Sequence, residues 1–213
     1  MGSVERIVGF DAREMWLDPT ASWSEKRRTG FLFRPDVPKP LSTDTAVWPS
    51  VFDMNDNTRP PDCFGHQDLC EELATVQSHL RDRSSVRAGH SYLVAITVFL
   101  ESTKHTEAQE WDALLTATVP AVRENSWSFL GFDVSDQWLL SGLSNCGFLP
   151  EVEDVSDLKR TWGPQLNQRH LFDSLAPATA FKNLSNERVK EHAPFYVFGV
   201  WLIEEYLKLD EEL

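Results

Sequence analysis

The segment Ser91–Glu101, SYLVAITVFLE, constrains the fold of this chain most, because both of its alternating faces are apolar. Successive side chains of a β-strand point to opposite faces of the sheet. The apolar side chains fall on one face at Tyr92, Val94, Ile96 and Val98, and on the other at Leu93, Ala95 and Phe99. A strand that buries both faces lies inside a sheet that is covered on both sides. We therefore predict a central strand here and a protein built around a sheet.

Helical periodicity elsewhere in the chain predicts helices that pack on this sheet. Between His66 and Arg83, apolar residues repeat at helical spacing and form one stripe, at Leu69, Leu73, Val76 and Leu80. Helices are also predicted at Glu107–Val119, Asp154–Trp162 and Ser174–Lys190, with a short helix capped by Ser135. Strands are predicted at Ile7–Phe10, Gly30–Phe33 and Ser128–Val134. Residues 195–203 fit a strand or a helix, and a helix is favoured because Pro194 suits a first helical position.

The mixture of these elements and the chain length predict a single α+β domain over residues 1–213. Its core is expected to be a central sheet, mixed or antiparallel, with helices packed on it. Residues 34–65 are rich in proline and polar residues, which excludes a regular element there. We predict a long ordered loop in that region, pinned to the body by Trp48 and Phe52. No internal repeat is recognised in the sequence.

Charge and cysteine content limit the class of partner and the compartment. The net charge of −13 is uneven: residues 1–106 hold 15 acids and 12 bases (net −3), and residues 107–213 hold 18 acids and 8 bases (net −10). Such a field argues against nucleic-acid binding and favours a cationic partner. Three cysteines do not make a disulfide framework and suit a reducing compartment. With no secretory signal and no apolar stretch long enough to span a membrane, a cytoplasmic protein is expected.

The acidic half contains one stretch, from Glu124 to Lys159, with seven acids and no basic residue before Lys159. Five aromatic residues are interleaved with these acids, which ties the stretch into the fold. An exposed tryptophan among carboxylates is typical of a protein interface, because the ring supplies buried area and the acids attract a basic partner. The predicted partner-binding residues are Asp133, Asp136, Trp138, Glu151, Glu153, Asp154 and Asp157.

Two groups of residues could form a metal site or a catalytic site, and neither interpretation is favoured. Cys63, His66 and Cys70 resemble a metal site, but no second Cys/His pair follows at zinc spacing, so core cysteines are the better interpretation. Cys146 has His170 or His192 as a possible base, with Asp173 to orient it, and this thiol-dependent hydrolase is the alternative function. Phosphate-binding loops are absent from the sequence. We therefore predict no catalytic residue, no metal and no cofactor.

Two segments resemble a known class of proteins. Gly131–Phe148, GFDVSDQWLLSGLSNCGF, and Arg188–Ile203, RVKEHAPFYVFGVWLI, are similar to bacterial immunity proteins of polymorphic toxin and type VI secretion systems. The most similar family accompanies restriction-endonuclease-like toxins. The resemblance implies an α+β cytoplasmic protein without catalytic activity, which binds and neutralises a cognate antibacterial toxin, such as a nuclease with a basic cleft. It implies no particular binding residue, and the sequence does not indicate an oligomeric state.

Overall fold

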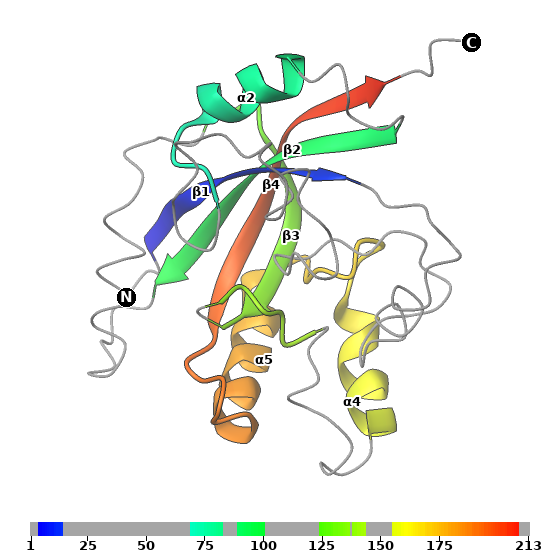
Figure 1. Cartoon of the computed structure of the whole chain (residues 1–213). Coiled ribbons are helices and arrows are strands. Elements are labelled where there is room, and N and C mark those ends of the chain that lie inside the picture. Colours follow the sequence, from blue (N-terminus) through cyan, green and yellow to red (C-terminus); the bar gives the residue numbers. More distant parts are fainter. Residues whose placement is uncertain are drawn as a thin grey trace. The chain divides into compact units, whose positions relative to one another are not determined.

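The computed structural model describes residues 4–14, 69–82, 89–100, 124–136, 138–143 and 155–208 (Figure 1). Several predictions fall on other segments and lie outside the described residues: the strand at Gly30–Phe33, the loop at 34–65 and the helix at Glu107–Val119. Among the described residues, no helix is both long and apolar enough to cross a membrane.

The described strands form one four-stranded antiparallel sheet with helices, which confirms the predicted α+β class. The strands are β1 (Val4–Glu14), β2 (Gly89–Leu100), β3 (Ser128–Ser135) and β4 (Tyr196–Lys208), in the order β1-β2-β4-β3. β1 pairs with β2 from Val4 opposite Leu100 to Glu14 opposite Ser91, with a register shift between Ile7 and Gly9. The strands predicted at Ile7–Phe10 and Ser128–Val134 are therefore confirmed as parts of β1 and β3.

β2 and β4 are the two inner strands of the sheet, and the sequence predicted a strand for β2 but a helix for the start of β4. The predicted central strand is confirmed, because every residue of β2 from Leu93 to Val98 is buried. The helix favoured for residues 195–203 is wrong, since β4 begins at Tyr196 and includes the rest of this segment. Tyr196–Val200 are all buried, so consecutive side chains meet protein on both faces of the strand. An inner sheet position can bury both faces of such a segment.

Three α-helices are described: α2 (Leu73–Asp82), α4 (Val155–Trp162) and α5 (Leu175–Arg188), with a 3-10 turn, η3, at Gly163–Gln165. α4 and α5 confirm the predicted helices to within two residues at their described ends. α2 begins later than predicted, because Cys70 pairs with Phe10 of β1 through two backbone hydrogen bonds of 2.8 Å. The short helix predicted after Ser135 is wrong, since the chain turns back there and Ser141 pairs with Ser135.

The described elements cluster into two compact units, each with its own core. Unit 1 contains β1, α2, β2, residues 124–129 and the part of β4 from Trp201 onward. Its core is apolar and includes Phe10, whose ring packs edge-on against Trp127 with centroids 5.9 Å apart. Unit 2 contains residues 130–136, 138–143 and 155–200. Its aromatic core joins Trp162, Phe172 and Phe181, with centroid distances between 5.1 and 6.2 Å.

Candidate functional site

The two tryptophans of the acidic stretch take different positions. Trp127 is buried, whereas Trp138 is 53% exposed and is the exposed large hydrophobic side chain of the described residues. Phe132 and Leu139 are buried, so Trp138 is the large apolar side chain of this region that faces solvent. A single exposed apolar residue is ordinary by itself. What distinguishes Trp138 is the way in which its backbone is held.

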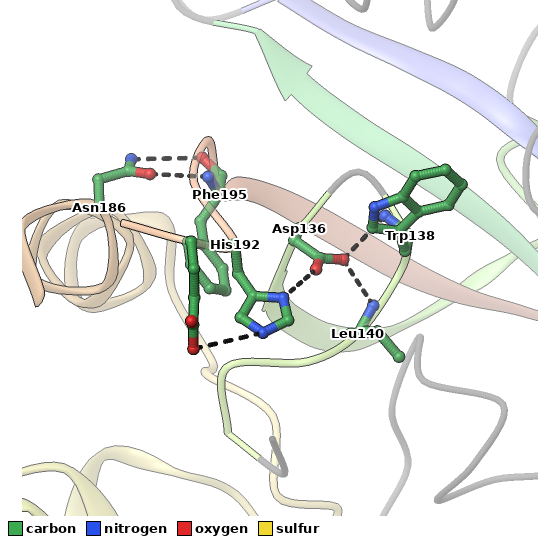
Figure 2. A network of polar contacts seen from close by, with 7 residues as sticks. Asp136, Trp138, Leu140, Asn186, His192 and Phe195 are labelled. Carbon is green, nitrogen blue, oxygen red and sulfur yellow. Dashed lines mark hydrogen bonds and ion pairs between the residues drawn. The ribbon is translucent and has the colours of Figure 1, made fainter. Parts of the chain in front are cut away.

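Asp136 fixes the turn that carries Trp138. Its Oδ1 accepts hydrogen bonds from the backbone N–H of Trp138, at 2.8 Å, and of Leu140, at 3.0 Å (Figure 2). The backbone of Asp136 also pairs with Leu140, whose carbonyl accepts from the Asp136 N–H at 3.1 Å. Between them, Leu139 has φ 57°, a left-handed conformation that a residue with a branched side chain adopts at a cost. The turn is thus held in one conformation by several contacts.

His192 holds the other oxygen of the same carboxylate. Its Nδ1 lies 3.2 Å from Asp136 Oδ2, and the Asp136 side chain is fully buried while the His192 side chain is 30% exposed. On the other side of the ring, Nε2 lies 3.9 Å from Glu191 Oε1 at the protein surface. Burial raises the pKa of the Asp136 carboxyl, and the hydrogen bonds from Leu140 and Trp138 and the contact with His192 oppose that rise.

The loop that carries His192 is tied to α5. Asn186 Oδ1 accepts from the Phe195 N–H at 2.7 Å, and its Nδ2 lies 3.5 Å from the Phe195 carbonyl oxygen. Phe195 is itself buried, and its ring would touch a Cβ placed on Gly142, at 3.4 Å. His192 therefore reaches Asp136 from a loop anchored at both its helix and its strand.

Asp133 and Asp136 do not take the surface role predicted for them. Asp133 is buried, and its Oδ1 accepts from the Val134 N–H at 2.7 Å and from the Ser141 hydroxyl at 2.6 Å. Asp136 is buried as well, with the contacts given above. Both carboxylates face inward because the turn uses them as acceptors for its own N–H and O–H groups. They shape the surface around Trp138 rather than form it.

The remaining predicted residues are placed only in part. Glu151, Glu153 and Asp154 lie outside the described residues, and Asp157 belongs to α4, which places its backbone alone. For the hydrolase alternative, Cys146 also lies outside the described residues. His170 is buried, and Asp173 accepts a hydrogen bond from Asn167 at 2.8 Å. With Cys146 outside the described residues, the grouping of Cys146 with a histidine base stays a prediction.

Cys70 is buried and disulfide-bonded, with a partner outside the described residues. The number of cysteines in the sequence did not indicate this bond. Among the described residues, no group of three or more His, Cys, Asp or Glu side chains is arranged to hold a metal ion.

No family model matches this chain, and no curated protein or solved structure matches it. Function must therefore be argued from the geometry of the turn at Asp136, Trp138 and His192. Sequence reasoning singled out Asp136 and Trp138, but it considered His192 only as a catalytic base. The pairing of His192 with Asp136 joins residues 56 positions apart, and no local sequence signal indicates it.

Proposed function

We propose that this protein binds a basic protein partner through a surface centred on Trp138. The observation that carries the proposal is an indole that is 53% exposed on a turn whose backbone is fixed by a buried carboxylate. Tryptophan is enriched among the residues that dominate interface energetics, because it buries a large area with few rotatable bonds. A turn that is already ordered also loses little conformational entropy when a partner binds.

Charge supports a basic partner. The chain carries a net charge of −13, which raises the rate at which a cationic protein is captured. Glu191 presents an exposed carboxylate beside His192, on the loop that supports the turn. With the resemblance of Gly131–Phe148 to immunity proteins, we propose that the partner is an antibacterial toxin, such as a nuclease with a basic cleft. The protein then acts as a cytoplasmic inhibitor without catalysis.

The test takes the protein encoded next to this gene as the expected toxin, purifies its toxin domain and titrates it calorimetrically with the wild type and with Trp138→Ala. We expect the substitution to cost about 2 kcal/mol or more, roughly thirtyfold in Kd, because the buried indole is lost. Urea unfolding of the free variant should stay close to wild type, since the ring is exposed. An unchanged Kd for Trp138→Ala removes this turn from the interface.

A charge reversal with a matched control tests the basic character of the partner. Glu191→Lys should weaken toxin binding, whereas Glu71→Lys makes the same change at an exposed acid of unit 1 and should have the smaller effect. Equal effects of the two substitutions would reduce the role of charge to the net field of the whole chain.

A hydrolase is the second candidate, and the Asp136–His192 contact favours it. A carboxylate on Nδ1 with Nε2 near the surface is the arrangement of a histidine base and its orienting acid. Against it, Nε2 faces Glu191, and no hydroxyl or thiol of the described residues bonds to it. Alkylation of the native protein at neutral pH, followed by peptide mass spectrometry, separates the two functions. Rapid modification of Cys146 that His192→Ala abolishes would support the hydrolase.

A further inference from the structure

Two segments of the chain share a short sequence, and each begins within a strand of the sheet. Residues 9–17, GFDAREMWL, and residues 131–139, GFDVSDQWL, are identical at five of nine positions. The first segment begins within β1 of unit 1 and the second within β3 of unit 2. No repeat was recognised from the sequence alone, but the described residues Gly9–Asp11 and Gly131–Asp133 also make matching contacts.

In each unit, the phenylalanine of this motif pairs with a residue that precedes a helix. Phe10 and Cys70 exchange two backbone hydrogen bonds of 2.8 Å, and Phe132 and Phe172 exchange two of 2.8 and 2.9 Å. The following aspartate also behaves alike in both units. Asp11 Oδ1 accepts from the Ala12 N–H and Asp133 Oδ1 from the Val134 N–H, each at 2.7 Å.

The glycine of the motif is required for the same reason in both units. A Cβ on Gly9 would lie 2.6 Å from Leu69 Cβ and 3.0 Å from the Cys70 carbonyl oxygen. A Cβ on Gly131 would lie 2.5 Å from Leu171 Cβ and 3.0 Å from the Phe172 carbonyl oxygen. Only glycine lets the strand approach the paired segment this closely.

The correspondence continues through the helix and the second strand. α2 begins at Leu73 and α5 at Leu175, each four residues after the leucine that contacts the glycine. Tyr92 near the start of β2 then corresponds to Tyr196 at the start of β4. In the strand order β1-β2-β4-β3, the strands that follow the helices, β2 and β4, are the inner ones, and β1 and β3 are the outer ones. Chance similarity of one tripeptide does not explain matching contacts at the glycine, phenylalanine and aspartate together with a helix that starts at the same spacing.

The two units differ at the turn that carries Trp138. The position of Asp136 is Glu14 in the first unit, and the position four residues before the tyrosine is His192 in the second unit and Ala88 in the first. The shared aspartates also have different partners. Arg13 Nε lies 2.6 Å from Asp11 Oδ2, whereas the Ser141 hydroxyl donates to Asp133 at 2.6 Å. The shared glycine, phenylalanine and aspartate therefore build the scaffold, and the Asp136–His192 pair has no counterpart in the sequence of the first unit.

We infer that this chain is a tandem duplication of one strand–helix–strand unit, and that Asp136 and His192 are the positioning residues that made the second copy the partner-binding one. The second clause rests on the proposed function of Trp138. In this view Asp136 sets the backbone of the turn and His192 orients the carboxylate, while the partner touches Trp138.

The duplication is tested by equivalent substitutions in the full-length chain. Gly9→Ala and Gly131→Ala should both lower the urea midpoint, Gly131→Ala more strongly because Gly131 also has φ 143°. Gly163→Ala is the matched control, since its new Cβ meets nothing within 4 Å. If Gly9→Ala behaves like Gly163→Ala, the two glycines do not have the same role and the duplication is overturned.

The positioning role is tested by exchanging residues between the copies. Asp136→Glu places the first copy's residue in the turn, and Glu14→Asp makes the reverse change as a control. We expect Asp136→Glu to shift the amide NMR resonances of Trp138 and Leu140 and to weaken binding of the purified toxin domain by about tenfold, because the longer side chain misplaces the acceptor. Glu14→Asp should leave both unchanged. His192→Ala should act like Asp136→Glu, and His192→Asn, which keeps a donor near the Nδ1 position, should restore most of the binding.

The outcomes separate this inference from the function on which it rests. Unshifted Trp138 and Leu140 amides in Asp136→Glu and His192→Ala overturn the positioning role, whatever the partner is. If Trp138→Ala abolishes toxin binding while these two variants bind normally, the proposed function stands and the positioning role fails. If Trp138→Ala binds normally while the resonances shift as expected, the positioning of the turn stands and its use for binding fails.

Discussion

Asp133 and Asp136 show how far the role of a single residue depends on its surroundings. A buried carboxylate loses its hydration, and this loss is tolerated only when hydrogen-bond donors replace the water. Asp136 receives two backbone N–H groups and the His192 ring, and Asp133 receives a backbone N–H and the Ser141 hydroxyl. In both cases the acid stabilises a local chain conformation, and Trp138 is the residue left to meet a partner.

The titration of Asp136 gives a prediction at this scale. Because its pKa is raised in the folded protein, the folded state holds a proton more tightly than the unfolded state does. Its stabilising contribution is therefore complete below the ordinary carboxyl value of 3.8 and is lost as pH rises through the raised pKa. Asp136→Asn cannot titrate, so the free energy of unfolding of wild type minus variant should fall with rising pH. Urea unfolding from acid to neutral pH measures this difference, and a difference that grows with pH would contradict the raised pKa.

At the scale of elements, the connection between α5 and β4 decides whether the site forms. This connection carries His192, and Asn186 fixes its end by bonding both backbone groups of Phe195. β4 then continues as an inner strand, so the loop enters a rigid part of the sheet. The position of His192 is thus determined by two elements on either side of it.

Removing the Asn186 side chain should loosen this connection. Asn186→Ala leaves the N–H of the buried Phe195 without its acceptor, which we expect to cost about 1–3 kcal/mol of unfolding free energy. Hydrogen exchange at Phe195 and at the Trp138 and Leu140 amides should accelerate, because the His192 loop is released. Asn183→Ala, at an exposed position of the same helix, is the control and should change neither quantity. Exchange that speeds up only at Phe195 would mean that the loop and the turn are independent.

At the scale of the whole molecule, charge and duplication act together. The net charge of −13 supplies a long-range field, whereas the contacts at Trp138 are local. Two copies of one unit also provide a stable scaffold on which one copy can change without loss of the fold. Most of the net negative charge, −10, lies in residues 107–213, and this half of the chain also contains the copy with the Trp138 turn.

The long-range charge and the contact at Trp138 should affect different rate constants of binding. Raising the salt concentration should lower the association rate of the toxin domain, because the charges that attract it are screened within about 8 Å at physiological ionic strength. Trp138→Ala should instead raise the dissociation rate and leave the salt dependence of association unchanged. Surface plasmon resonance over a series of salt concentrations measures both rates. An association rate that does not depend on salt would argue against a basic partner.

The sequence determined the elements whose pattern is local. The two apolar faces of Ser91–Glu101 required an inner strand, and helices were predicted at Asp154–Trp162 and Ser174–Lys190. Such patterns depend only on residues close in the chain, so they can be recognised without knowledge of the fold. The acidic and aromatic composition of the stretch from Glu124 to Lys159 is also local, and it pointed to Trp138 and Asp136.

Only the tertiary structure decided the rest, because burial is set by residues distant in the sequence. Residues 196–208 form a strand because they occupy an inner position in the sheet. Asp136, predicted as a surface acid, is a buried hydrogen-bond acceptor that contacts His192. The tertiary structure also revealed the repeat, whose identity is weak in sequence but clear in the pairing of Phe10 with Cys70 and of Phe132 with Phe172. Close backbone approach at Gly9 and Gly131 is a contact between distant segments, and a linear sequence records only the glycine that permits it.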